Sequence, residues 1–203
     1  VTTLGAALGI QRALLQLDSA REQARHLATH DQLTGLANRV LFNDRLSQAV
    51  AAARRSRHGL AVLYLDLDGF RTINEALGNS AGDGLLRGIA SQVNSCIGEA
   101  DTVARLGGDE FAVMLTQLPS ELEAARVAGR ISEVLARPIP FGQRNVSATA
   151  SIGIATFPRD GGEPDELVRM AETAMHHAKE RGRNRYEFYA RDMNAAILRR
   201  VSI

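Results

Sequence analysis

Residues 102–115 read Thr-Val-Ala-Arg-Leu-Gly-Gly-Asp-Glu-Phe-Ala-Val-Met-Leu, and this stretch carries the clearest structural signal in the chain. Thr102 to Leu106 and Glu110 to Leu115 are strand-like, because each is a short run rich in apolar and β-branched side chains. Gly107-Gly108 lies between them as a tight-turn dipeptide, since glycine readily adopts the positive φ angles that such turns need. The stretch therefore predicts a β-hairpin with two carboxylates directly after its turn.

A second strand signal lies upstream, over residues 60–67. These residues, Leu-Ala-Val-Leu-Tyr-Leu-Asp-Leu, are almost all apolar, which is typical of a strand buried on both faces. Helical patterns alternate with the strand signals, and a glycine-rich break is expected over 78–82. The order predicts an α+β fold, with a central mixed sheet of βαββαβ type covered by helices. The other predicted helices cover 40–54, 70–77, 83–97, 121–136 and 166–181, and the other predicted strands cover 147–156 and 186–189.

A further helix is expected near the N-terminus, over residues 7–28. Apolar residues recur there at alternating spacings of three and four, which makes a short heptad seam, while Arg and Glu occupy the other faces. Such a helix either packs on its own domain or serves as a linker that pairs with the same helix of a second chain, and the seam favours the linker. The seam residues are Ile10, Ala13, Leu17, Ala20, Ala24 and Leu27.

The composition is that of an ordinary globular protein. The chain has 203 residues, of which 45% are hydrophobic and 23% are charged, and its formal net charge is +1. This charge gives no bulk attraction to nucleic acid, so no nucleic-acid partner is expected. The single cysteine excludes an intrachain disulfide, and no apolar run approaches the roughly 20 residues that span a membrane. We expect a cytoplasmic location, with any membrane anchor of a parent protein lying outside this chain.

Carboxylates follow the predicted strands at two places. Asp66 and Asp68 end the strand over 60–67, and Asp109 and Glu110 follow the glycine turn. If the two strands are neighbours, these side chains converge at one edge of the sheet, where they would suit Mg²⁺ ions that assist displacement at phosphorus. Each feature also has a purely structural interpretation, because an Asp at a strand end often forms a turn or a helix cap, and paired glycines often only close a hairpin.

Lys179 and Arg183 form a second candidate site. Of the 24 basic residues only Lys179 is a lysine, and the four-residue spacing would place both cations on one helical face near a C-terminus. They either complement the helix dipole or clamp a polyphosphate, with Arg183 gripping bidentately and Lys179 acting as a point charge. A single lysine in an arginine-rich chain favours the phosphate clamp.

These residues belong to a series of motifs that together resemble the GGDEF domains, a family that makes cyclic di-GMP from two GTP molecules. The resemblance covers about residues 27–190. Each motif alone is weak, but their order and spacing together are highly specific. The motifs are Asp31-Gln-Leu-Thr-Gly-Leu-Ala-Asn-Arg39, Asp66-Leu-Asp-Gly-Phe-Arg-Thr-Ile-Asn-Glu75, Gly78, Gly82-Asp83, Arg105-Leu-Gly-Gly-Asp-Glu-Phe111, Ser151-Ile-Gly-Ile-Ala155, Lys179 and Gly182-Arg-Asn-Arg185.

The resemblance implies roles for the acidic residues and for the lysine. Asp66, Asp109, Glu110 and the carbonyl of Leu67 would be ligands of Mg²⁺ or Mn²⁺, with two ions in each active site. Asp109, Glu110 and Lys179 would be the catalytic residues. This assignment matches the chemistry of hard oxygen ligands around a divalent ion.

The resemblance also implies a GTP site. Lys179 and Arg183 would hold the triphosphate, and Asn74 and Asp83 would read the guanine edge, whose N–H donors a carboxylate can accept. The remaining implied substrate-binding residues lie in the hairpin turn, at the start of a helix and beside the guanine-binding stretch: Gly107, Gly108, Phe70, Arg71 and Asn79.

The implied reaction is that of a diguanylate cyclase. The 3′-hydroxyl of one GTP would attack the α-phosphorus of the other in line, with pyrophosphate leaving. Each domain would hold one GTP, so catalysis would need a homodimer with two facing active sites. Positioning and charge neutralisation would supply most of the rate. The N-terminal helix would then set whether the two sites meet.

Two departures from the family pattern bear on this function. Asn79 stands where the family often has His, but Asn can still hydrogen-bond, so GTP binding is expected to survive. The family's inhibitory product site carries an Arg-x-x-Asp motif, of which Asp101 is present while Gly98 replaces the arginine. We therefore expect this product site to be degenerate, and feedback inhibition through it to be weak or absent.

The flanking segments resemble junctions with other domains. Residues 26–31 resemble the exit from a PAS-type sensor domain, and the chain beyond 186 resembles the junction in tandem GGDEF–EAL proteins, which carry an EAL phosphodiesterase domain. The resulting division is a coiled-coil-like helical linker over 1–28, a GGDEF domain over 29–190, and the start of a linker to a following domain over 191–203.

Two alternative functions remain open. In a tandem protein the domain could be a catalytically weak GTP-binding module that regulates the attached phosphodiesterase. Alternatively, the chain could be another nucleotidyl cyclase or a polymerase-like enzyme, which Asn74 and Asp83 disfavour because they suit guanine rather than adenine.

Overall fold

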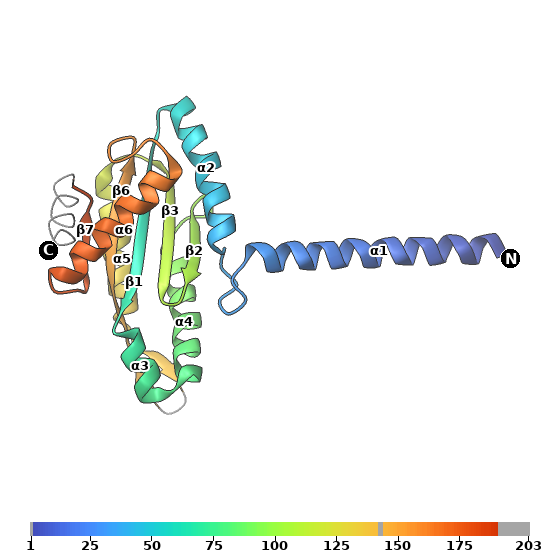
Figure 1. Cartoon of the computed structure of the whole chain (residues 1–203), viewed down its shortest axis with the longest axis horizontal. Helices are drawn as coiled ribbons and strands as arrows, with labels where there is room; N and C mark the ends of the chain where they lie inside the picture. The colour runs from blue at the N-terminus through green and yellow to red at the C-terminus, as the bar shows by residue number, and fades with distance from the viewer. Residues whose placement is uncertain (1, 142–143, 191–203) are drawn as a thin grey trace, which may run out of the picture.

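The computed structural model describes the backbone of residues 2–141 and 144–190, and the side chains of residues 15–139 and 146–190. The helices are α1 (Thr2–Thr29), α2 (Arg39–Ser56), α3 (Phe70–Leu77), α4 (Asn79–Asn94), α5 (Glu121–Leu135) and α6 (Pro164–Glu180). The strands are β1 (Gly59–Asp68), β2 (Thr102–Gly107), β3 (Glu110–Leu118), β4 (Ile139–Phe141), β5 (Arg144–Val146), β6 (Thr149–Phe157) and β7 (Arg185–Phe188). Five of these strands form one sheet in the order β2-β3-β1-β6-β7, and β4 pairs separately with β5 (Figure 1).

Strand β1 lies at the centre of the sheet. It pairs antiparallel with β3 on one side and with β6 on the other. β2 extends the sheet antiparallel to β3, while β7 joins β6 in parallel, so the sheet is mixed. The near-continuous apolar run of β1 follows from this position, because a central strand covered on both faces has no side that meets water. The predicted α+β fold, with a helix-covered mixed sheet, is confirmed.

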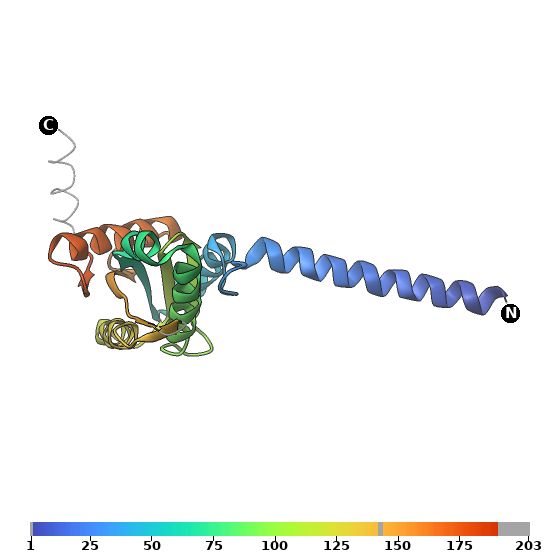
Figure 2. The ribbon, with the colours of Figure 1, turned by 90° about the horizontal axis from the view of Figure 1, so that it is seen from below.

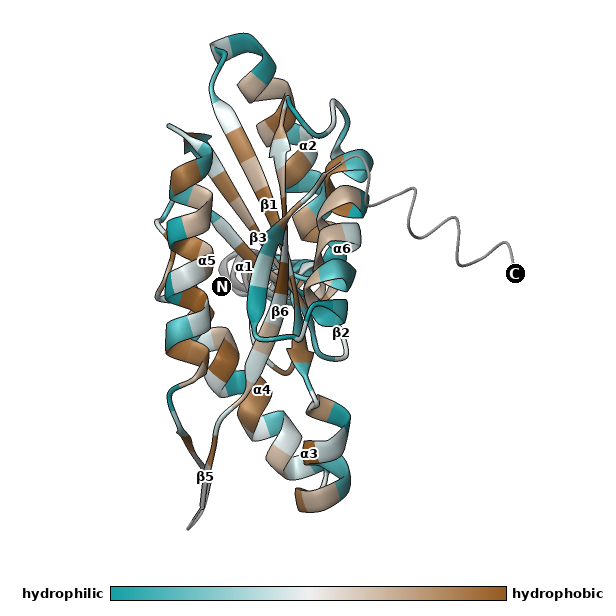
Figure 3. Ribbon diagram, turned by 90° about the vertical axis from the view of Figure 1, so that its left-hand side faces the viewer, coloured by the Kyte–Doolittle hydropathy of each residue, from teal (hydrophilic) through white to brown (hydrophobic). Residues whose placement is uncertain are grey.

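The two faces of the sheet carry two separate cores. Val62 and Tyr64 of β1 are buried with α2 and α6, whereas Leu63 and Leu65 are buried with α4 and α5. Figures 2 and 3 show helices on both sides of the strands, with α5 opposite α6 and the hydrophobic segments between them. The period-2 alternation of a strand thus divides one apolar run between two helical layers.

Helix α6 approaches β6 unusually closely, and Gly153 makes this possible. A β-carbon at position 153 would overlap the carbonyl oxygen of Ala171 and the amide nitrogen of Met175. Because glycine has no side chain, the backbone of α6 can lie directly against the sheet at this position. This contact matters for the site, because α6 also carries Lys179.

Helix α1 projects away from the domain (Figure 1). Leu15, Leu17 and Leu27 on it are exposed, at 65%, 50% and 55%. The helix observed over Thr2–Thr29 agrees with the predicted N-terminal helix, and its pairing with a second chain stays a prediction. None of the helices in the described ranges is long and apolar enough to cross a membrane.

A wide turn over residues 30–38 joins α1 to the sheet. Ala37 bridges Ala104 of β2, and the amide of Arg105 donates to the carbonyl of Ala37. Asn38 fastens both flanking helices, because its side-chain oxygen accepts from Leu41 N–H at the start of α2 while its amide group donates to Ala28 O in α1. The exit of α1 is thereby attached to the same strand that leads into the Gly107-Gly108 turn.

The structure differs from the sequence-based expectations at three places. The glycine-rich segment 78–82 is not a loop, since α4 begins at Asn79; Gly78, with φ 84°, separates it from α3. The β4–β5 hairpin was not predicted, because its three-residue strands are too short to show a periodicity. Helix α6 ends at Glu180, before Arg183. The predicted start of a linker at 191–203 lies outside the described residues.

Candidate active site

An acidic edge forms where β1 and β3 lie side by side. Asp66 of β1 and Glu110 of β3 are direct partners in the strand register, so their side chains emerge on the same face. The carbonyl of Asp109 accepts from the amide of Leu67 at 3.3 Å, which joins the end of the turn to the end of β1. The structure therefore brings together the two acidic segments that the sequence places about forty residues apart.

Lys179 reaches this edge from α6. Its Nζ lies 2.7 Å from Oδ1 of Asp66, and the two side chains are 28% and 13% exposed. Burial raises the pKa of Asp66, the ion pair with Lys179 opposes this, and the nearby carboxylates of Asp109 and Glu110 raise it further. The carboxylates thus repel one another, and an added cation would relieve that repulsion.

Arg183 does not share a helical face with Lys179. It has φ 60° and Asn184 has φ 47°, so both belong to a left-handed turn after α6. Two contacts fix that turn: Arg183 N–H donates to Ala178 O, and Asn184 N–H donates to Asp68. The helical spacing rule fails here because the helix ends first. Arg183 is exposed at the C-terminal end of α6.

Asp68 has a structural role rather than a place in the acidic edge. Its carboxylate accepts hydrogen bonds from Thr149 Oγ1 and Ser151 Oγ, both at 2.7 Å, and from the amide of Asn184 at 3.0 Å. These contacts join β1, β6 and the turn after α6. Asp68 thus helps to hold the turn that carries Arg183.

Two further residues approach Glu110, and the sequence analysis gave neither a role. A guanidinium nitrogen of Arg39, at the start of α2, lies 3.6 Å from Glu110 Oε2. The Tyr64 phenol is buried under the same carboxylate, and burial together with the Glu110 charge raises its pKa. In the sequence, Arg39 stands out only as the last residue of the Asp31–Arg39 motif. Tyr64 stands out only because its hydroxyl group is polar in an otherwise apolar strand.

Arg105 holds the hairpin turn in place. Its Nη1 bonds both carboxylate oxygens of Asp31 at 3.0 and 3.1 Å, while Nε and Nη2 donate to the carbonyl of Gly108 at 3.0 and 2.7 Å. The turn itself uses φ 145° at Gly107 and φ 51° at Gly108, which favour glycine. A β-carbon at either glycine would meet open space, so backbone conformation, and not crowding, requires glycine there.

The predicted guanine readers lie on α3 and α4. Asn74 Oδ1 is buried without a hydrogen-bond partner among the described residues. Gly82 lies against it, since a β-carbon at position 82 would overlap this oxygen. Asn79 and Asp83 are exposed in the first two turns of α4. A buried amide oxygen lacking a partner is costly, so this position favours a ligand that donates a hydrogen bond.

The start of α3 accounts for two more predicted substrate residues. Phe70 and Arg71 open the helix directly after Gly69, which has φ 70° and offers no side-chain cap. The first amides of a helix have no intrahelical acceptor and suit an anion. The Arg71 side chain itself pairs with Glu75 at 2.8 Å on the exposed face.

Comparison with known proteins identifies the family. The family model described as "Diguanylate cyclase, GGDEF domain" matches residues 28–185. The chain belongs to the GGDEF domain family. The GGDEF domain of TpbB from Pseudomonas aeruginosa superposes with a TM-score of 0.82 at 40% identity, covering 83% of this chain and 99% of that one.

Two curated relatives of this GGDEF domain are longer proteins, both from Pseudomonas aeruginosa. The bifunctional diguanylate cyclase/cyclic di-GMP phosphodiesterase MucR is 41% identical over 96% of this chain and 29% of its own length. The cyclic di-GMP phosphodiesterase NbdA is 39% identical over 91% of this chain and 23% of its own length. The chain therefore spans less than a third of either relative.

The acidic edge of this GGDEF domain suits a divalent ion by its chemistry. Asp66, Asp109 and Glu110 offer hard oxygen ligands, and the ammonium of Lys179 already sits where positive charge is favoured. Within the described ranges, no three His, Cys, Asp or Glu side chains are gathered tightly enough to enclose an ion. The residues present fit Mg²⁺ with substrate phosphates completing its shell, which is the usual way this ion is held.

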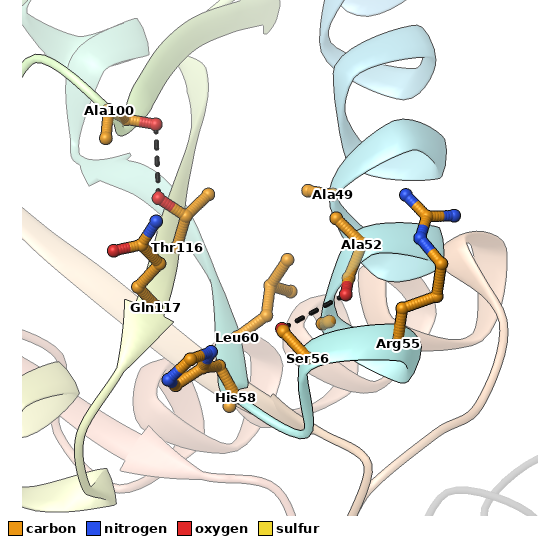
Figure 4. Close-up of a pocket in the computed structure, with 11 residues that line it drawn as sticks. Ala49, Ala52, Arg55, Ser56, His58, Leu60, Ala100, Thr116 and Gln117 are labelled. Atoms are coloured by element: carbon orange, nitrogen blue, oxygen red, sulfur yellow. Dashed lines mark hydrogen bonds between the residues drawn. The ribbon is translucent and has the colours of Figure 1, made fainter.

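The opposite end of the sheet carries the residues of the expected product site. Asp101 accepts hydrogen bonds from the amide of Gly98 at 3.1 Å and from the amide of Thr116 at 2.9 Å. A cavity of about 740 Å³ lies beside it, between the end of α2 and β3, with His58 and Gln117 at its wall (Figure 4). Asp101 is thus occupied by the backbone of its own loop.

Proposed function

We propose that this GGDEF domain condenses two GTP molecules into cyclic di-GMP and two pyrophosphates. The observation that carries the proposal is the Asp66–Lys179 ion pair beside Glu110, at the edge that the Gly107-Gly108 turn adjoins. An ammonium and several carboxylates at one open edge suit a magnesium–triphosphate, because each charge gains a partner of opposite sign when it binds.

The acidic residues would hold the metal and one of them would assist the reaction. Asp66, Asp109, Glu110 and the carbonyl of Leu67 would be the ligands of two Mg²⁺ or Mn²⁺ ions, which would neutralise phosphate charge. Lys179 would leave Asp66 for the triphosphate when the metal takes its place. Glu110, held by Arg39 in the free protein, would lie near the attacking 3′-hydroxyl.

The substrate would be read by α3, α4 and the turn after α6. Asn74 Oδ1 would gain from guanine the donor that it lacks among the described residues. Asp83 would accept from the guanine N–H groups, and Asn79 would add a polar contact at the same edge. Arg183 would grip the phosphates from its turn, and Gly107-Gly108 would let the nucleotide lie against the backbone without a β-carbon between them.

A homodimer would be the active form, because each domain contributes one GTP to the product. The exposed leucines of α1 support this, since a helix that projects from its domain with an apolar seam is suited to pairing. In a parent protein, an N-terminal sensor domain would act through α1, and an EAL phosphodiesterase domain would follow the C-terminus.

Incubation of the purified chain with GTP and Mg²⁺, followed by chromatography, tests the proposal. We expect cyclic di-GMP from GTP, no cyclic product from ATP, and loss of product in Glu110→Gln. Deleting two residues from α1, which rotates the seam by about half a turn, should lower the rate, and an unchanged rate would separate α1 from catalysis.

The alternative is a GTP-binding regulatory module attached to a phosphodiesterase. The relationship to NbdA, a protein named for its phosphodiesterase activity, supports it. The same experiment separates the two functions. GTP that is bound but not converted by a confirmed dimer favours the regulatory module.

A further inference from the structure

A pair of histidines lies at the end of α1, away from the GTP site. His26 is in the last turn of α1, and His30 directly follows the helix, with its amide donating to the carbonyl of His26 at 2.9 Å. Their rings stack with centroids 4.0 Å apart and an interplanar angle of 19°. His26 is exposed and His30 is half-buried. The pair is therefore accessible to solvent, and the stacking holds the two rings next to each other.

The hydrogen bonds around His30 determine which ring nitrogen carries the proton. Its Nδ1 lies 2.9 Å from Thr29 Oγ1 and 3.2 Å from the carbonyl of His26. The carbonyl can only accept, and the Thr29 hydroxyl uses its proton on the carbonyl of Arg25 at 2.7 Å. Nδ1 must therefore be the donor in both contacts, which leaves a lone pair on Nε2 of the neutral ring.

The Nδ1 hydrogen bonds of His30 are of the kind that metal-binding histidines make. A ligating His normally donates its second ring N–H to a carbonyl or another acceptor, which fixes the tautomer and orients the ring. The ring of His26 makes no hydrogen bond with any residue that the structure describes, so its nitrogens are open to a ligand. The two rings are stacked side by side, so rotation of the exposed His26 side chain would bring one of its nitrogens to an ion bound by Nε2 of His30.

We propose that His26 and His30 form a two-histidine site for a borderline divalent ion such as Zn²⁺, Cu²⁺ or Ni²⁺. Imidazole suits these ions, whereas Mg²⁺ prefers oxygen. No third His, Cys, Asp or Glu joins the pair within the described ranges, so water fills the other coordination positions. This site is separate from the GTP chemistry, and it stands whether or not the domain makes cyclic di-GMP.

The site lies at the junction between α1 and the domain. His30 bridges Ala37 in the wide turn, and the next residue, Asp31, binds Arg105, which holds the carbonyl of Gly108. An ion bound by both rings would cross-link the last turn of α1 and oppose its fraying. It would thereby stiffen the connection through which α1 is joined to the hairpin turn.

Electron spin-echo spectroscopy of the full chain with one equivalent of Cu²⁺ tests the site, because the remote nitrogens of bound imidazoles can be counted. Excess Mg²⁺ occupies carboxylates, which give no such signal. We expect two imidazoles in the wild type and one in His26→Gln or His30→Gln. His58→Gln is the control and should leave the count at two. One imidazole in the wild type, or an unchanged count in either variant, would overturn the proposal.

Zinc titration by calorimetry gives a second readout on the same proteins. Each ligand variant should weaken Zn²⁺ binding by at least about tenfold, since loss of even an outer partner costs about 10- to 100-fold. Circular dichroism checks that the variants are folded, which is expected because His26 is exposed and His30 is only half-buried. Equal Zn²⁺ affinity in the wild type and in the double variant His26→Gln/His30→Gln would contradict the site.

Discussion

The two ends of the central sheet carry similar residues in opposite states. At one end, Asp66 and Glu110 are held by the side-chain cations Lys179 and Arg39. At the other end, Asp101 is held by the backbone amides of Gly98 and Thr116. A side-chain cation on a flexible stem can move to a ligand, whereas a backbone amide within a loop or strand cannot. The first end is built to exchange partners, and the second is built to hold a loop to the sheet.

Asn74 and Asp68 extend this comparison within the first end. Asn74 Oδ1 is buried and lacks a partner among the described residues. Asp68, two residues beyond Asp66, already accepts three hydrogen bonds from other parts of the chain. The satisfaction of each polar group thus separates binding residues from structural ones more sharply than residue type does.

The largest expected effect is that of Lys179→Ala on turnover. Removing one charge that stabilises a reacting phosphate typically lowers the rate by about 100-fold or more. The thermal midpoint should fall as well, because without the ammonium the largely buried Asp66 carboxylate is unpaired beside Asp109 and Glu110, but the folded variant should still be inactive. Measurement of cyclic di-GMP production and thermal unfolding on the same samples checks both.

Arg181→Ala is the matched control for this prediction. Arg181 lies two residues from Lys179, and its exposed guanidinium makes only a long contact of 3.5 Å with Glu187. Such pairs contribute little to stability, so neither turnover nor unfolding should change. If the two alanine variants lost activity equally, Lys179 would have no special role.

Asp101→Ala should show a different pattern. Two backbone amides lose their acceptor, so the free energy of unfolding should fall by about 1–2 kcal/mol. Turnover of the folded protein should stay unchanged, since the residue lies at the far end of the sheet. Urea unfolding monitored by circular dichroism, beside the cyclase assay, gives both quantities. Glu99→Ala is the control, because this neighbouring carboxylate is exposed and should change stability by less than about 0.5 kcal/mol.

Product binding offers a direct test of the second end. Cyclic di-GMP should bind weakly or not at all there, because Gly98 supplies no cation and Asp101 is occupied by backbone. Calorimetry of the folded dimer with cyclic di-GMP measures this. Tight binding that is lost in Asp101→Ala would show that the product site works without its arginine.

The smallest expected effect is on acid stability at the junction between α1 and the hairpin. Burial raises the pKa of Asp31, but hydrogen bonds from Thr34 and the ion pair with Arg105 outweigh it, so its pKa lies below the usual value. A lowered carboxyl pKa contributes stability above about pH 4 that is lost as the pH falls further. Asp31→Asn should therefore flatten the loss of stability between about pH 5 and pH 3. Urea unfolding across that range checks the slope, and parallel curves for both proteins would exclude the contribution.

Local signals predicted the elements well where they were long. The apolar run of β1 and the Gly107-Gly108 turn appear as expected, because burial and positive φ leave marks in the residues themselves. The prediction failed where the decisive contact was distant. Gly82 was predicted to belong to a loop, yet it lies inside α4. Glycine is required there because a β-carbon would overlap the side chain of Asn74, a contact that the local sequence does not show. The β4–β5 hairpin was too short to be seen.

The candidate site, too, has features that the sequence shows and features that only the structure shows. Its carboxylates, its lysine and its glycines are identifiable from the sequence, since their chemistry is carried by residue type. The sequence could not show that Lys179 pairs with Asp66, that Arg39 pairs with Glu110, or that Arg183 leaves the helix, because these depend on how separate elements pack.

By itself, the amino-acid sequence determined which elements form, which chemical groups the protein holds, and the family to which it belongs. These properties follow from local periodicity, backbone preference and residue identity. Only the tertiary structure decided which carboxylates are free to exchange partners and which are not. That distinction depends on hydrogen bonds between residues far apart in the chain, such as Asp68 with Asn184, and it exists only once the sheet has brought them together.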